Sequence, residues 1–143
     1  MKKPLLFSAV VLLLFNGISA LYGGGLLVID PSGAGLQLPL SYLHYSPFSD
    51  YLIPGIVLLG ANGLLSLVTA VLAVIQHRYY THFIILQGVI LCGWIFIQVV
   101  MVRDIYYLHY IMGTVGLLLT GLGIILFKKE AHRKKNADPS CRA

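Results

Sequence analysis

Four long apolar stretches that contain no Lys, Arg, Asp or Glu constrain this chain more than any other feature. They cover residues 5–29, 51–75, 83–102 and 110–127. A helix needs about 20 such residues to cross the roughly 30 Å hydrocarbon core of a bilayer. The chain has only 15 Lys, Arg, Asp and Glu residues, and eight of them lie in the last 16 positions, so a water-soluble fold would lack a polar exterior. We therefore expect an integral membrane protein.

The connections between the later stretches predict how the helices run. Only residues 76–82 and 103–109 separate the last three stretches, and links this short make neighbouring helices antiparallel. The fold class that we predict is an all-α membrane protein, an antiparallel four-transmembrane-helix bundle, in one domain over residues 1–127. Residues 128–143 are expected to form a basic cytoplasmic tail that is disordered.

The basic residues predict the orientation in the membrane. Arg103 is the one basic residue expected on the outer side, and the positive-inside rule places the richer side in the cytoplasm. We expect an inner-membrane protein with both termini cytoplasmic. Because the net charge of +5 comes mainly from the tail, we expect lipid headgroup contacts and no nucleic acid. The nine basic residues on the inner side are Lys2, Lys3, Arg78, Lys128, Lys129, Arg133, Lys134, Lys135 and Arg142.

The first stretch has a second interpretation. Two lysines, an apolar run and Ile18-Ser19-Ala20 also resemble a cleavable signal peptide. The apolar run continues past this point to Ile29, and cleavage would leave an odd number of spans, so we favour a retained first helix. A mature protein that starts at Leu21 would contradict this expectation.

The segment between the first two spans is expected to be a re-entrant or interfacial segment outside the membrane. Asp30-Pro31-Ser32-Gly33 has the form of a type I turn, and Ser46-Pro47 has the form of a helix start. The segment could cap the bundle, act as a lid over a binding site, or bind a partner. It is apolar for a loop in water because it contains Leu36, Leu38, Leu40, Leu43 and Phe48.

Polar side chains within the spans are the candidate ligand-binding residues, since such groups face a bundle interior. Asn62, Ser66, Thr69 and Ala73 follow one another at intervals of three or four residues, so they lie on one face of a helix. They either bridge helices by hydrogen bonds or line a pocket for a small lipid-like molecule. The candidates are Asn16, Asn62, Ser66, Gln87, Trp94 and Gln98. Small residues such as Gly116 and Thr120 predict close helix packing.

Ionisable groups near the outer boundary are the candidate catalytic residues. Histidine can act as a base near neutral pH, but no spacing matches a metal site, and we expect no metal and no cofactor. No carboxylate lies within a span, which disfavours proton-coupled transport. The candidates are His44, Asp50, Arg103, Asp104 and His109.

Several motifs resemble those of small bacterial four-helix membrane proteins to which no activity is assigned. They are Tyr22-Gly23-Gly24, residues 30–33, Ser46-Pro47-Phe48, residues 51–55, and Gly93-Trp94 with Gln98. The resemblance covers most of the chain except the tail and implies the fold but no activity. Proteins of the DoxX-like group are similar only in size and number of spans.

The sequence favours a non-enzymatic bundle with a structural or accessory role, or one that binds lipid-like ligands. Two alternatives stay open: a small membrane enzyme with its site at the outer face, and an oligomeric channel or transporter. The expected partners are the bilayer, a lipid-like small molecule, and either further copies of the chain or another membrane protein.

Overall fold

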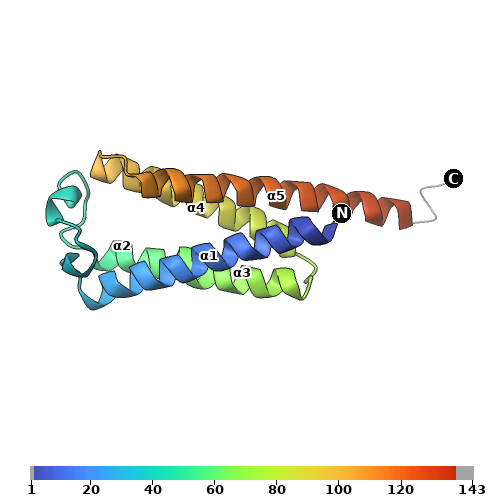
Figure 1. Ribbon diagram of the computed structural model, residues 1–143, viewed down its shortest axis with the longest axis horizontal. Coiled ribbons are helices and arrows are strands. Elements are labelled where there is room, and N and C mark those ends of the chain that lie inside the picture. The colour runs from blue at the N-terminus through green and yellow to red at the C-terminus, as the bar shows by residue number, and fades with distance from the viewer. Residues whose placement is uncertain (1, 138–143) are drawn as a thin grey trace.

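The computed structural model describes residues 2–137, which form helices and no strand (Figure 1). The segments α2, η3 and α3 follow one another without a break, so they make one long helix in which η3 is a π-helical stretch. Four apolar helices are therefore long enough to cross a membrane within the described residues. The elements are α1 (Lys2–Ile29), η1 (Ala34–Leu36), η2 (Leu40–Leu43), α2 (Leu52–Val57), η3 (Leu58–Leu64), α3 (Leu65–Val74), α4 (Tyr80–Val102) and α5 (Tyr107–Ala137).

The start of α2 differs from the prediction of a helix at Ser46-Pro47. The Ser46 hydroxyl accepts a hydrogen bond from the Phe48 backbone N–H at 3.2 Å, which closes a turn rather than a helix. The helix begins at Leu52, whose backbone N–H donates to Asp50 Oδ1 at 3.0 Å. Pro54 is tolerated in this first turn because the N–H that it lacks would have no partner within the helix.

The end of α5 also differs from the sequence-based expectation. The helix continues ten residues beyond Phe127 to Ala137, whereas a disordered tail was expected from residue 128. Lys, Glu, Ala and Arg are strong helix formers, and Lys134 and Lys135 in the last turn favour the negative end of the helix dipole. Residues 138–143 of the predicted tail lie outside the described part of the chain.

The turn predicted after α1 is present. The Gly33 backbone N–H donates to the Asp30 carbonyl at 3.1 Å, and the Ser32 hydroxyl donates to Asp30 Oδ1 at 2.6 Å. This second bond holds the pKa of Asp30 below its usual range. Gly33 has a φ of 78°, and a Cβ there would lie 2.6 Å from the Leu38 carbonyl oxygen. Only glycine fits this position without strain.

α4 packs mainly against α5, and α1 packs mainly against the α2–η3–α3 helix. α4 approaches α5 closely at Gly88, where an added Cβ would lie 2.6 Å from the Thr120 backbone nitrogen and 2.8 Å from the Gly116 carbonyl oxygen. The small residues Gly116 and Thr120 thus permit close helix packing, as their spacing predicted.

One end of the structure brings together both termini of the described chain and the α3–α4 turn (Figure 1). Lys2, at the start of α1, forms an ion pair with Glu130 in the last turns of α5. The Lys2 ammonium also lies 5.6 Å from the ring centroid of Tyr80, the first residue of α4. Three distant parts of the sequence therefore meet at this end.

The segment over residues 30–51 folds against the opposite end, between the two helix pairs (Figure 1). Leu43 is buried there with Leu27 and Tyr51. The Tyr42 and Tyr106 hydroxyls are hydrogen-bonded to each other, which ties η2 to the turn before α5. The apolar character of this segment thus reflects packing onto the helix ends.

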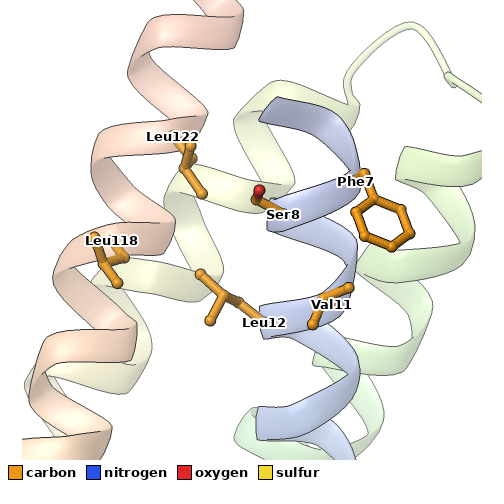
Figure 2. A pocket seen from close by; sticks show the side chains of 6 residues that line it. All are labelled: Phe7, Ser8, Val11, Leu12, Leu118 and Leu122. Carbon is orange, nitrogen blue, oxygen red and sulfur yellow. The ribbon is translucent and has the colours of Figure 1, made fainter. Parts of the chain in front are cut away.

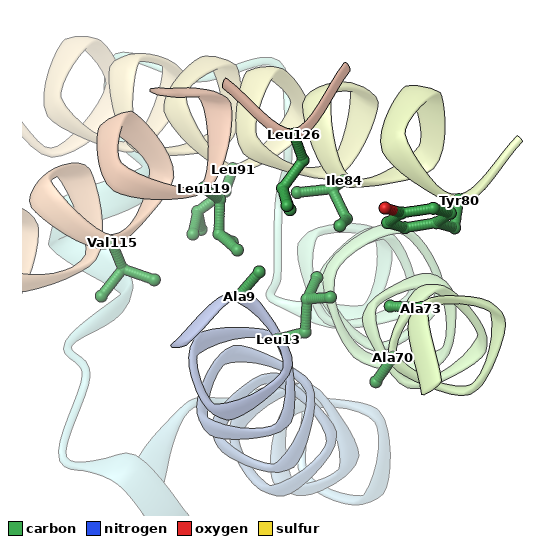
Figure 3. Packing of buried hydrophobic residues seen from close by; sticks show 10 residues of the cluster. All are labelled: Ala9, Leu13, Ala70, Ala73, Tyr80, Ile84, Leu91, Val115, Leu119 and Leu126. Atoms are coloured by element: carbon green, nitrogen blue, oxygen red, sulfur yellow. The ribbon is translucent and has the colours of Figure 1, made fainter. Parts of the chain in front are cut away.

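The core lies between the helices, with most of each helix facing outward. Figure 3 shows Leu13 of α1, Ile84 of α4 and Leu119 of α5 converging, and each of these side chains is fully buried. Only 22–33% of the residues in the apolar window of each helix are buried. Phe7, Phe96 and many other large apolar side chains are exposed. Soluble monomers rarely expose contiguous apolar surface on this scale.

Candidate functional site

Three of the predicted ligand-binding residues form a buried hydrogen-bonded group between α1 and the η3–α3 helix. Asn16 Nδ2 donates to Ser66 Oγ at 2.7 Å and to the Asn62 backbone carbonyl at 3.3 Å. Asn16, Asn62 and Ser66 are all at most 1% exposed. Their amide and hydroxyl groups thus bridge two helices, which is one of the two roles that the sequence left open.

Gln87 joins this group from α4. Its Nε2 donates to the Ala61 carbonyl at 3.3 Å and lies 3.5 Å from Asn62 Oδ1. The π-helical η3 makes this possible, because the Leu65 N–H bonds to the carbonyl of Gly60 instead of that of Ala61. The Ala61 carbonyl thereby lacks its usual donor four residues later, and it accepts the side-chain N–H of Gln87. π-Helical turns of this kind occur frequently at functional sites.

The polar cluster of Asn16, Asn62, Ser66 and Gln87 is incompletely bonded. Asn62 Nδ2 and Gln87 Oε1 are buried and have no hydrogen-bond partner within the described residues. A buried polar group without a partner costs roughly 1–3 kcal/mol. The cluster therefore contains one free donor group and one free acceptor, beside the interhelical bonds that Asn16 and Gln87 donate.

Trp94 and Gln98 do not join the polar cluster, although the sequence grouped them with Gln87 as candidate ligand-binding residues. Both are only partly buried, and neither side chain hydrogen-bonds to the cluster within residues 2–137. The Trp94 indole N–H is buried without a partner. The α4 prediction thus succeeds for Gln87, which lies two turns closer to the helix start than Trp94.

The polar stripe predicted on the second span is confirmed. Asn62, Ser66, Thr69 and Ala73 are all fully buried. On α5, by contrast, Thr114 is exposed and its hydroxyl donates to the Tyr110 carbonyl at 2.7 Å. A threonine that bonds to its own helix needs no partner in the bundle interior.

The catalytic candidates gather at the end that carries residues 30–51, and three of them make local contacts between neighbouring parts of the chain. The Arg103 guanidinium lies 3.9 Å from the Tyr45 ring centroid, and the His44 ring packs edge-on against the same tyrosine at 5.1 Å. Asp50 accepts the bond from the first N–H of α2, as described above.

The other two catalytic candidates lie at the turn between α4 and α5. His109 Nδ1 accepts a hydrogen bond from the Tyr106 backbone N–H at 3.0 Å, and Asp104 is exposed. Within residues 2–137 no group of three His, Cys, Asp or Glu side chains could hold a metal ion.

A groove that the sequence did not indicate lies between α1 and α5. Its volume is about 450 Å³, within the ~300–1,000 Å³ range of small-molecule sites. Figure 2 shows Ser8 and Leu12 of α1 directed toward Leu118 and Leu122 of α5. The Ser8 hydroxyl donates to the Pro4 carbonyl at 3.0 Å, so the groove surface is apolar. The residues that line it are Phe7, Ser8, Val11, Leu12, Leu118 and Leu122.

No sequence signal distinguishes the groove residues from their neighbours. They are apolar residues within apolar spans, and α1 contacts α5 less extensively than α4 does. The distance between two packed helices depends on the side chains of both. The sequence of either helix alone therefore does not predict it.

Comparison with known proteins adds no assignment. No family model, curated protein or solved structure matches this chain. The function must therefore be argued from the geometry of the chain itself.

Proposed function

We propose that this chain is a non-catalytic integral membrane protein that binds the hydrocarbon part of a lipid-like molecule in the groove between α1 and α5. Its four long helices would cross the inner membrane in antiparallel order, with both termini in the cytoplasm. The groove is the observation that carries this proposal, because its walls are apolar and it is open to the surface of the bundle.

Membrane insertion is supported by the outward-facing side chains and by the distribution of charge. Eight of the basic residues in the described chain belong to the end that holds both termini and the α3–α4 turn, and Arg103 belongs to the other end. This asymmetry is typical of a cytoplasmic and an external side. The apolar exterior between the two ends matches a hydrocarbon environment.

The groove suits hydrocarbon better than a polar ligand. It opens on the side of the bundle that would face lipid, and its one hydroxyl, on Ser8, already bonds to Pro4. Lys3 precedes Phe7 by one helical turn. It thus extends the groove side of α1 toward water, where an anionic headgroup would lie.

A matched pair of tryptophan variants tests the proposal. Val11 lines the groove, whereas Ile18 lies two turns further along the same face of α1, is 62% exposed and does not line it. Val11→Trp should fill the groove and Ile18→Trp should leave it open. Both variants would be purified in mild detergent, and retained lipid-like molecules would be counted per chain by mass spectrometry after exhaustive washing.

The expected result is about one retained molecule per chain in the unmodified protein and in Ile18→Trp, and a loss of most of it in Val11→Trp. Equal retention in all three proteins would contradict a role for the groove.

The topology is tested separately with a chain that lacks Cys92 and Cys141. An impermeant maleimide should label Ser41→Cys in intact cells, and Lys135→Cys only after permeabilisation. The reverse labelling would contradict the orientation.

A further inference from the structure

A second hollow, of about 330 Å³, lies where the α3–α4 turn meets the last turns of α5. Three permanently charged basic residues line it: Arg78 from the turn, and Arg133 and Lys134 from α5. Two histidines, His77 and His82, line it as well. We refer to this hollow as the basic pocket.

The one acidic residue that lines the basic pocket is already neutralised. Glu130 forms an ion pair with Lys2 and lies 3.5 Å from Arg133 Nη2. The Tyr80 hydroxyl donates a third bond to it, at 3.2 Å. Within residues 2–137 no ion pair reaches Arg78 or Lys134, so their charge can act on a ligand. The pocket therefore carries a positive excess.

The basic pocket combines this charge with aromatic surface. Phe127 and Tyr80 line it, and the Phe127 ring packs edge-on against His82 with centroids 5.1 Å apart. Phe127 is the last residue of an apolar stretch, and Lys128 follows it. A pocket with one apolar side and one cationic side, at the edge of an apolar span, fits the depth at which lipid phosphates lie in a bilayer.

We propose that the basic pocket binds the phosphate of an anionic phospholipid headgroup, with Arg78, Arg133 and Lys134 as its cationic partners. Arginine offers planar paired donors that match phosphate oxygens, and lysine adds a mobile point charge. This inference rests on the proposed membrane insertion but not on the groove, which lies against a different set of α5 residues.

Two double variants of equal charge test the inference. Arg133→Gln with Lys134→Gln removes two cations from the basic pocket. Lys128→Gln with Lys129→Gln removes two cations from the same helix, and neither residue lines the pocket. Arg78→Gln is a third variant, which changes the pocket from the turn and leaves α5 intact.

Each protein would be incorporated into lipid nanodiscs and released for native mass spectrometry, with phosphatidylglycerol and phosphatidylcholine offered in equal amounts. A basic residue close to anionic lipid contributes about 1 kcal/mol, or about fivefold. We expect the preference for phosphatidylglycerol to fall about 25-fold in the Arg133/Lys134 double variant and about fivefold in Arg78→Gln. The Lys128/Lys129 double variant should keep most of its preference.

An equal loss in both double variants would show a general charge effect and overturn the proposed site. Displacement of phosphatidylglycerol by 10 mM inorganic phosphate, used as a competitor at constant ionic strength, would assign the pocket to a soluble phosphate and overturn the lipid assignment. Failure of the unmodified protein to enter nanodiscs would refute membrane insertion itself, which is a different outcome from an altered lipid preference. Unchanged circular dichroism and detergent unfolding of each variant would show that lost binding does not reflect lost fold.

Discussion

The buried polar cluster predicts that two asparagines of the same bundle respond unequally to truncation. Asn16 and Asn62 are both fully buried, and each loses the same atoms when it is replaced by alanine. Asn16 donates two interhelical hydrogen bonds, at 2.7 and 3.3 Å. The Asn62 side chain accepts one long contact at 3.5 Å, and its Nδ2 has no partner within the described residues.

The expected difference follows from these bonds. An interhelical hydrogen bond in a membrane protein averages about 0.6 kcal/mol, so Asn16→Ala loses about 1.2 kcal/mol of bonding in addition to the cavity that it leaves. Asn62→Ala leaves a similar cavity but removes an unsatisfied amide, whose burial costs roughly 1–3 kcal/mol. The free energy of unfolding should therefore fall by at least about 1 kcal/mol more for Asn16→Ala than for Asn62→Ala.

The assay is reversible unfolding in mixed micelles at increasing SDS mole fraction, followed by the fluorescence of Trp94, the single tryptophan of the chain. Its position partway along α4 and its partly buried ring make it a reporter of helix packing. Asn16→Ser serves as a control that can retain part of the bonding. If Asn62→Ala lowers the free energy of unfolding as much as Asn16→Ala or more, the two hydrogen bonds donated by Asn16 are not the stabilising part of the cluster.

Two further predictions concern helix packing and the end that carries residues 30–51. Gly88→Val should lower the free energy of unfolding in SDS by about 1–3 kcal/mol or more, because the larger side chain would overpack against α5. Gly93→Val should change this free energy little, because nothing lies within 4 Å of an added Cβ there. Equal effects of the two variants would contradict this packing. The hydrogen bond with Tyr42 raises the pKa of Tyr106 to about 12. The contribution of this hydrogen bond to the stability of the fold should therefore be complete below about pH 10 and disappear as the pH rises through about 12. Tyr42→Phe should return the Tyr106 titration toward 10 in ultraviolet absorbance, and an unchanged titration would exclude the hydrogen bond as the cause.

Local sequence patterns predicted correctly those structural features that depend on neighbouring residues alone. The turn at residues 30–33 follows from Asp, Pro and Gly at defined positions, and the structure contains it. The inward stripe of Asn62, Ser66 and Thr69 follows from helical spacing. The start predicted at Ser46 was wrong because Asp50, four residues later, offers a carboxylate to the first N–H of α2. The sequence offers both Ser46 and Asp50 as residues that could start the helix. Which of them does so depends on how the segment packs.

The candidate site depended on the arrangement of helices. The sequence singled out Asn16, Asn62, Ser66 and Gln87, but it also grouped Trp94 and Gln98 with them, and only the first four meet. The π-helical η3, which frees the Ala61 carbonyl for Gln87, has no signature in a run of apolar and small residues. Its formation depends on which neighbour supplies a replacement hydrogen bond.

The sequence by itself determined the four apolar helices and the unequal charge of the two ends, because the length of an apolar run and the count of lysines and arginines are properties of the chain alone. Only the tertiary structure decided which polar groups are bonded, where α1 and α5 leave a groove, and how Arg78 comes to lie beside Arg133 and Lys134. Those features depend on the rotation and spacing of helices that are distant in the sequence, and interhelical packing sets both.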